Sequence, residues 1–499
     1  MDIKRAKQEM KNTVEAYLAK DEFGEYRIPA IRQRPVLLMG PPGIGKTQIM
    51  EQIAKECGIG LVAYTITHHT RQSAVGLPFI QEKEYAGRTV SVTEYTMSEI
   101  IASVYEKMEQ TGIHEGILFI DEINCVSETL APTMLQFLQA KTFGNQKVPD
   151  GWIIAAAGNP PEYNKSVREF DVVTLDRIRK IDVEARFDVW KEYAYRQGIH
   201  PAVISYLELR RQNFYRIETT VDGKEFATAR GWEDLSQLIQ TYEILGKHAD
   251  RDVVYQYIQH RMISKDFANY LELWYKYKTD YQVEDLLAGK WNVSTLQKIK
   301  AAPFDEHLSM ISLLNGKLSE LFRENCRLDA YVTKLYDYLL RYKENQDSVR
   351  IMDIWHMAEQ ELAAEQKKEL LTRWDEMIMK KTVSTLERFA KETHGAADMF
   401  AEVKAMFEQE TKLLEQQTGD TADMLDHAFQ FMEDAFGESQ EMVVFITELN
   451  ANSYAVRFIK ENGCDLYYRY NKGLLFEERQ QSILRQMDEA EDMLNRGLK

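Results

Sequence analysis

One short stretch constrains the fold of this 499-residue chain more than any other. It fits the pattern G-x-x-x-x-G-K-[ST] and reads Gly40-Pro41-Pro42-Gly43-Ile44-Gly45-Lys46-Thr47. An apolar run at 35–39 precedes it, and a helical pattern at 47–57, with Ile49 and Ile53 on one face, follows it. Strand, glycine loop and helix in this order form a phosphate-binding unit, because successive backbone N–H groups and the helix N-terminus point at one anion.

The residue types in the loop agree with that chemistry. Lys46 is long enough to reach the outer phosphates of a nucleotide, and the Thr47 hydroxyl is a ligand for Mg²⁺. We expect the nucleotide to be held by the loop and the residue after it, namely Gly40, Pro41, Pro42, Gly43, Ile44, Gly45, Lys46, Thr47 and Gln48.

A second motif indicates hydrolysis of that nucleotide. The apolar run at 117–120 ends in two carboxylates, Asp121 and Glu122. Asp121 is placed to hold Mg²⁺ together with Thr47, and Glu122 is placed to polarise the water that attacks the γ-phosphate.

A third apolar strand, at 152–157, ends in Gly158-Asn159-Pro160-Pro161. An amide at this strand tip would lie beside Glu122 if the two strands are neighbours in the sheet. Asn159 would then orient the attacking water.

Apolar strands and helical patterns alternate over the first part of the chain, after an amphipathic helix predicted at 1–20. Strands are expected at 35–39, 60–66, 89–95, 116–120, 152–157 and 179–183, and helices at 47–57, 96–110 and 127–140. Near-continuous apolar strands separated by helices predict a parallel sheet covered on both faces. The 89–95 segment alternates apolar and polar residues instead, which predicts a partly exposed hairpin strand.

From about residue 186 the pattern becomes helical. Helices are expected at 186–197, 201–212 and 230–245, followed by a helical stretch over 250–290. No proline follows Pro303, and the charged, leucine-containing segment 361–381 is typical of a long helical hairpin arm. We therefore expect the remainder of the chain to be helical.

The net charge of −17 is concentrated at the C-terminal end, because residues 301–499 carry 24 Lys/Arg against 38 Asp/Glu. Such a surface repels phosphate backbones, which makes nucleic acid an unlikely partner. The four cysteines are scattered and indicate neither a zinc site nor a disulfide framework. The charged N-terminus and the lack of a long apolar run predict a cytoplasmic protein that makes no use of a membrane.

Five motifs occur in order along the chain. They are Gly40 to Thr47, Phe119-Ile120-Asp121-Glu122-Ile123-Asn124, Gly158-Asn159-Pro160, Leu175-Asp176-Arg177 and Ala229-Arg230-Gly231-Trp232-Glu233. Over roughly residues 25–290, this ordered set resembles the AAA+ ATPases, and within them the MoxR-like branch. The first two motifs are shared by many P-loop ATPases, and the ordered set of five is much more specific.

The resemblance implies an α/β P-loop (AAA+) core with a parallel sheet, an α-helical lid and a mainly α-helical C-terminal domain. The implied domains are an N-terminal helix at 1–24, the nucleotide-binding core at 25–185, the lid with following helices at 186–295, and an acidic helical domain at 296–499. ATP and Mg²⁺ are the implied ligands, with Thr47 and Asp121 at the metal.

The resemblance also implies roles for single residues, beside Lys46 and Glu122 in the catalytic set. Asn159 looks like the sensor of the γ-phosphate. Arg177 looks like the arginine finger that enters the neighbouring subunit's site, and Arg179 is an alternative finger. Arg230 looks like the second sensor, which contacts the nucleotide of its own subunit.

By the same resemblance, the segment from Thr65 to Pro78 faces the central channel of a ring. The charged tip at 82–88 is similar to the family's hairpin insert and is a candidate contact for a substrate.

These expectations combine into an ATP-hydrolysing homo-oligomer, a ring that is hexameric when nucleotide is bound and that remodels a protein client. MoxR-like proteins act with von Willebrand factor A domain partners, so such a partner is implied. Two alternatives remain open. One is a nucleic-acid-linked AAA+ motor or loader, and the other is a nucleotide-gated scaffold with little turnover.

Overall fold

The computed structural model describes residues 1–473 apart from 69–70, 86, 144–145, 164–169, 222, 345–348 and 395–397. By their contacts the residues form two compact units. The first comprises Met1–Val189, Thr228–Arg230 and Tyr338–Lys391, and the second comprises Trp190–Ala227, Gly231–Asp337 and the residues from Glu392 onward. Both units are therefore discontinuous in sequence. The domain boundaries implied by the resemblance stay a prediction.

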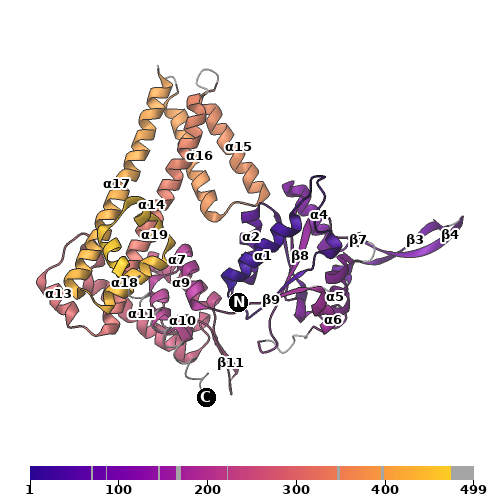
Figure 1. Ribbon diagram of the computed structural model, residues 1–499, viewed down its shortest axis with the longest axis horizontal. Helices are drawn as coiled ribbons and strands as arrows, with labels where there is room; N and C mark the ends of the chain where they lie inside the picture. Colours follow the sequence, from indigo (N-terminus) through magenta and orange to yellow (C-terminus); the bar gives the residue numbers. More distant parts are fainter. Residues whose placement is uncertain are drawn as a thin grey trace, which may run out of the picture. The chain divides into compact units, whose positions relative to one another are not determined.

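A five-stranded parallel sheet lies at the centre of the first unit (Figure 1). Its strands are β1 (Val36–Met39), β2 (Gly60–Thr65), β5 (Gly116–Asp121), β8 (Trp152–Gly158) and β9 (Arg179–Asp182), in the order β2-β5-β8-β1-β9. All four pairings are parallel, so the carboxyl ends of the strands meet at one edge. β8 is buried along its whole length, which explains its continuous apolar sequence. The predicted parallel sheet is confirmed.

Helices of the first unit accompany this sheet. They are α1 (Ile3–Leu18), α2 (Lys46–Cys57), α3 (Arg71–Val75), α4 (Glu99–Thr111), α5 (Ala131–Ala140) and α6 (Val172–Arg177). α1, α2, α4 and α5 lie near predicted positions, whereas α3 and α6 are not predicted from the sequence. Ile49 and Ile53 are both buried on α2, as their spacing predicts. α1 lies along α2, where Lys7 donates to Gln52 at 2.9 Å and to Glu56 at 2.6 Å.

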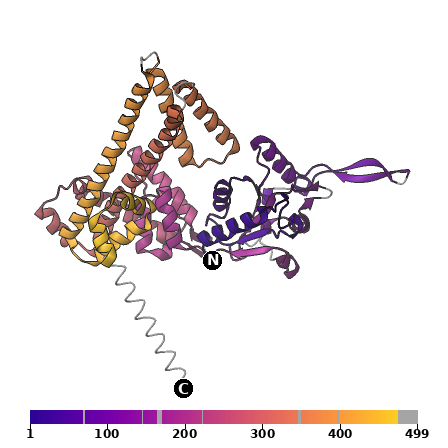
Figure 2. The ribbon, with the colours of Figure 1, turned by 45° about the horizontal axis from the view of Figure 1, so that its top comes forward.

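An antiparallel hairpin extends away from the sheet (Figure 1 and Figure 2). It consists of β3 (Pro78–Tyr85) and β4 (Arg88–Tyr95), which confirms the predicted hairpin strand at 89–95. The hairpin is exposed along most of its length. Residues 69–70 of the predicted channel-facing segment and residue 86 of the predicted tip lie outside the described residues. A second, short hairpin pairs β6 (Thr142–Phe143) with β7 (Gln146–Lys147).

The predicted helical arm at 361–381 is confirmed and returns to the first unit. α15 (Ile351–Lys368) and α16 (Arg373–Glu392) are joined by a short turn. This turn lies near the end of α2 and near α4, where Lys107 forms an ion pair with Glu369 at 2.5 Å. The segment 338–391 therefore packs against the sheet-containing part of the first unit, to which it belongs.

The second unit is mainly helical, as predicted. Its helices are α7 (Phe187–Gln197, which begins in the first unit), α8 (Pro201–Leu209), α9 (Ala229–Ile244, which also begins in the first unit), α10 (Arg251–Tyr257), α11 (Arg261–Tyr281), α12 (Val283–Leu287), α13 (Val293–Lys300), α14 (Phe304–Glu344, which ends in the first unit), α17 (Met399–Phe436), α18 (Gln440–Ala451) and α19 (Ser453–Asn462). Among the described residues, none of the helices combines the length and the apolar character that crossing a bilayer requires.

The sequence analysis misses one element of this unit. β10 (Arg216–Thr220) and β11 (Gly223–Ala227) form an antiparallel hairpin between α8 and α9. The ring nitrogens of His260, which is buried, lie 3.3 Å from Glu218 Oε2 and 3.5 Å from Glu225 Oε2. Two β-branched residues, Thr219 and Thr220, precede the turn, and Gly223 follows it. These are strand and turn signals, but the helical patterns on both sides obscure them.

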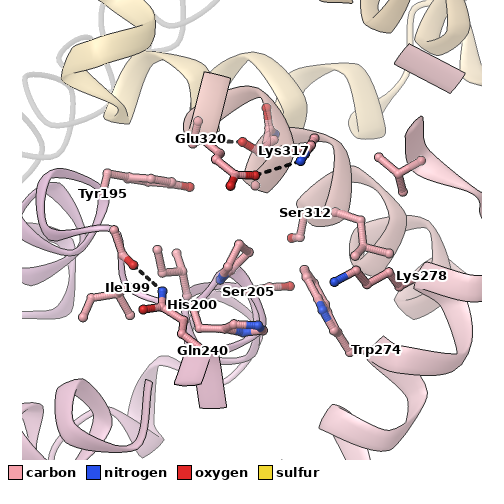
Figure 3. Close-up of a pocket in the computed structure, with 18 of the residues that line it drawn as sticks. Tyr195, Ile199, His200, Ser205, Gln240, Trp274, Lys278, Ser312, Lys317 and Glu320 are labelled. Atoms are coloured by element: carbon pink, nitrogen blue, oxygen red, sulfur yellow. Dashed lines mark hydrogen bonds and ion pairs between the residues drawn. The ribbon is translucent and has the colours of Figure 1, made fainter. Parts of the chain in front are cut away.

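The helices of the second unit also surround a pocket of approximately 480 Å³ (Figure 3). Side chains from α8, α9, α11 and α14 line it, including His200, Gln240, Trp274 and Ser312. None of the site residues expected from the sequence lines this pocket.

Candidate functional site: the glycine loop and the strand ends around it

The glycine loop connects β1 to α2 at the carboxyl edge of the sheet. Gly43 and Gly45 have φ values of 74° and 90°, in the region that favours glycine. Gly45 is the N-cap of α2, and the helix begins at the next residue, Lys46. The loop thus presents the first N–H groups of α2 to an anion, as the sequence predicts.

Gly43 also makes room for the residues that open α9. The Arg230 backbone N–H donates to the Gly43 carbonyl at 3.2 Å. A Cβ atom on Gly43 would lie 3.4 Å from the Cβ atoms of both Arg230 and Thr228. Arg230, which the resemblance assigns to the nucleotide, is therefore held directly against the phosphate-binding loop.

Lys46 is the buried cation of the site, with 8% of its surface exposed. Its ammonium group donates to the carbonyls of Gly40 and Pro41, both at 2.8 Å, and to Asn159 Oδ1 at 2.9 Å. These three acceptors match the three donors of a protonated lysine. Burial lowers the pKa of Lys46 to about 8, although the nearby Asp121 carboxylate acts in the opposite direction.

Thr47 and Asp121 converge from α2 and from the end of β5. The Thr47 hydroxyl donates to Asp121 Oδ2 at 2.9 Å, and Asp121 Oδ1 accepts from the Glu122 backbone N–H at 2.9 Å. A hydroxyl and a carboxylate oxygen in contact form the oxygen-rich donor set that Mg²⁺ prefers. The residues present therefore fit the predicted magnesium site.

Glu122 has an unusual backbone conformation, with φ 57° and ψ 34°. A residue other than glycine in this left-handed region stores strain, a feature that clusters at functional sites. Its Oε2 accepts a hydrogen bond from the Thr67 hydroxyl at 3.0 Å. Thr67 follows β2, the strand that pairs with β5, so the ends of two neighbouring strands fix this carboxylate.

Thr67 is a site residue that the sequence analysis misses. The available signal is its position just beyond an apolar strand, since polar residues at the carboxyl ends of parallel strands share one edge. Using that signal requires knowing that β2 and β5 are neighbours, and a single sequence does not show this.

Asn159 follows β8. This strand pairs with β5, which precedes Glu122, and the sequence prediction for Asn159 requires that these two strands be neighbours. The Asn159 side chain contacts Lys46, so Lys46 links the end of β8 to the loop. Of the site residues predicted from the sequence, the structure therefore brings Lys46 into contact with Asn159. Thr47, Asp121 and Glu122 form a second group of contacts.

The two candidate finger residues are in different surroundings. Arg177 ends α6 and is exposed, and its guanidinium donates to Gln139 Oε1. Arg179 donates to Glu9 Oε2 at 2.8 Å and to the Thr13 hydroxyl, and these bonds fasten β9 to α1.

Residues 36–176 match the model of a protein family described as ATPase family associated with various cellular activities (AAA). Over 145 residues the chain is 26% identical to the ATP-dependent zinc metalloprotease FtsH of Hahella chejuensis (strain KCTC 2396). That match covers 24% of this chain and 22% of the length of FtsH. Together with the parallel sheet and the loop geometry, these matches support an AAA-type domain with the P-loop fold over this part of the chain.

Proposed function

We propose that the chain is an ATP-hydrolysing AAA+ protein of the MoxR-like type, in which ATP turnover remodels a protein client. One observation carries the proposal. The side chains that phosphate transfer requires lie at the carboxyl ends of adjacent strands, where Thr47 contacts Asp121 and Lys46 contacts Asn159. Ligands bind at this edge in open parallel sheets.

The proposed reaction is in-line attack of water on the γ-phosphate of ATP. Lys46 neutralises charge on the outer phosphates, and it exchanges its present oxygen acceptors for phosphate oxygens when ATP binds. Thr47 and Asp121 would hold Mg²⁺, which would supply further positive charge beside the phosphates.

Glu122 acts as the base that accepts a proton from the attacking water. The Thr67 hydroxyl donates to one of its oxygens, Oε2, at 3.0 Å. Asn159 orients the water from the neighbouring strand end. Arg230 reaches the nucleotide from its position against Gly43.

Arg177 is the proposed arginine finger. Its exposed position on α6 suits a residue that acts on the site of a neighbouring subunit. Arg179 is engaged with α1 in its own chain, which favours Arg177. Such a finger ties hydrolysis to a homo-oligomer, for which we propose a hexameric ring.

The β3–β4 hairpin is the proposed client contact. Ile80 and Tyr85 are exposed on β3, and Val90 is exposed on β4. A two-stranded ribbon with unpaired edges and exposed apolar side chains suits capture of an extended segment. A von Willebrand factor A domain protein is the proposed partner, by analogy with the MoxR-like branch, and the acidic helical C-terminal region is its proposed docking part.

The central test compares Glu122→Gln with a matched variant, Glu109→Gln, at an exposed position on α4. We expect Glu122→Gln to bind a fluorescent ATP analogue normally and to release no phosphate. Glu109→Gln should behave like the unaltered chain. Unchanged turnover in Glu122→Gln would refute the assignment of the base, and stimulation of turnover by DNA or RNA would favour the nucleic-acid motor.

Mixing experiments test the shared site. Arg177→Ala and Lys46→Ala should each be inactive alone, and their mixture should recover part of the activity at mixed interfaces. Arg179→Ala, mixed in the same way, should show no such recovery. If only the Arg179 mixture recovers, the finger is Arg179.

A further inference from the structure

The side chain of Asn124 makes a pair of hydrogen bonds, and it has no role in the reaction proposed above. Asn124 lies in η3 (Ile123–Cys125), the single turn that follows Glu122, and it is 2% exposed. Its Nδ2 donates to the Asn159 carbonyl at 2.8 Å, and its Oδ1 accepts from the Asn159 backbone N–H at 3.3 Å. One side-chain amide therefore satisfies both backbone groups of Asn159.

This pair continues the sheet beyond its last strand pairing. β5 and β8 pair in register up to Ile120 and Ala156, after which the chain of β5 turns away. The Asn124 amide takes the place of a strand at Asn159, because an amide carries the same donor and acceptor as a peptide group. Asn159 is thereby held in a defined position although it lies past the end of β8.

Gly158 makes this arrangement possible. A Cβ atom at position 158 would lie 2.6 Å from Asn124 Oδ1 and 3.0 Å from Met39 Sδ. Both distances are too short for a methyl group, so a larger residue would displace the Asn124 amide. The glycine and the asparagine are therefore a matched pair.

We propose that Asn124 is a positioning residue for hydrolysis. It fixes the main chain of Asn159 and thereby directs the Asn159 side chain, which accepts from Lys46 at 2.9 Å, toward the γ-phosphate. Since Asn124 is two residues from Glu122, the same turn connects the base to the sensor. The inference rests on the proposed ATP hydrolysis, because it assigns a role within that reaction.

A positioning role predicts a specific kinetic pattern. Asn124→Ala should lower kcat by at least about tenfold, because small displacements of aligned groups are costly to turnover. The dissociation constant for an ATP analogue should stay within about threefold, since Asn124 does not contact the nucleotide loop. Gly158→Ala should give the same pattern with Asn124 intact. The double variant should be no slower than the slower single variant, because both changes remove one arrangement.

Gln33 provides the matched control. It is a buried side-chain amide that donates to the carbonyls of Tyr17 and Ile28 at 2.9 and 3.0 Å, and it precedes β1 at the opposite edge of the sheet. Gln33→Ala should lower the thermal midpoint without lowering kcat. If Asn124→Ala does not fold, Asn124→Asp replaces it, because this variant has the same size but does not donate to the Asn159 carbonyl.

The outcomes separate the inference from the proposed function. Turnover by the unaltered chain, together with a kcat loss shared by the Asn124 and Gly158 variants, would support the inference. A normal kcat in folded Asn124 variants would overturn it and leave hydrolysis intact, and so would losses that multiply in the double variant. An unaltered chain that binds the ATP analogue but releases no phosphate would overturn the proposed function, and the positioning role with it.

Discussion

The ammonium group of Lys46 offers a direct test of how the loop binds phosphate, because its pKa lies within reach of a binding assay. Burial lowers the pKa of Lys46 to about 8, against an ordinary value of 10.5, and Asp121 acts in the opposite direction. The protonated form therefore predominates at pH 7 and is lost as the pH rises through about 8. Phosphate oxygens favour the protonated form, so ATP should bind it more tightly.

The size of the effect follows from the titration of a single group. For a pKa of about 8, roughly nine-tenths of the nucleotide-free protein carries the Lys46 proton at pH 7 and roughly one-tenth carries it at pH 9. If ATP binds only the protonated form, its dissociation constant should rise about tenfold over this range. Binding at pH 9 should also take up close to one proton per ATP.

Titration with a fluorescent ATP analogue at constant ionic strength and excess Mg²⁺ would measure the affinity. Calorimetry in two buffers of different ionisation enthalpy would count the protons. Lys46→Arg should remove the pH dependence, because arginine stays charged over the whole range. Lys141→Met is the matched control, since burial also lowers the pKa of Lys141 to about 8 but its ammonium group donates to Gln33, away from the loop.

Two results would contradict this reasoning. A dissociation constant that stays flat between pH 7 and pH 9 would mean that Lys46 keeps its proton throughout. A pH dependence that persists in Lys46→Arg, or that disappears in Lys141→Met, would place the titrating group elsewhere.

Three other changes test separate parts of the structure. Gly43→Ala should weaken ATP binding by at least about tenfold, because a side chain at its φ of 74° costs roughly 1–2 kcal/mol and distorts the loop beside Arg230. Normal affinity in a titration would contradict this. Thr67→Val should lower kcat about threefold or more at unchanged ATP affinity, because Glu122 loses its orienting contact; steady-state kinetics with an equal or higher kcat would argue against that role. Lys191→Met should cost about 3 kcal/mol in denaturant unfolding, since it leaves the buried Glu448 carboxylate without its cation, and a loss below about 1 kcal/mol would show that this ion pair is dispensable.

Much of the first unit is predictable because its signals are local. β5 and β8 are buried on both faces, so each appears in the sequence as an unbroken apolar run with a clear end. The loop before α2 has the residue spacing G-x-x-x-x-G-K-[ST], which few structures other than phosphate-binding loops require. Lys46 and Thr47 could therefore be assigned from neighbouring residues alone.

The remaining site features depend on which strands are neighbours. β1 lies between β8 and β9 although the chain reaches it before either of them. Thr67 contacts Glu122, and Asn124 contacts Asn159, only because β2, β5 and β8 are adjacent in this sheet. Polar residues that meet through strand order leave no periodic signal, so the sequence points to Asn124 only within a motif and to Thr67 only within the segment expected to face a channel.

Helix α9 gives the site a physical connection to the rest of the chain. Its first residues, with Arg230, pack against Gly43 in the first unit, and from Gly231 onward it belongs to the second unit. A helix of 16 residues is roughly 24 Å long and stiff over that distance. The first turn of this helix carries Arg230 beside the loop, where an arriving phosphate would meet it. Gly43, which has a φ of 74° and whose carbonyl accepts from the Arg230 backbone N–H, is then the position where a side chain would disturb both the loop and Arg230.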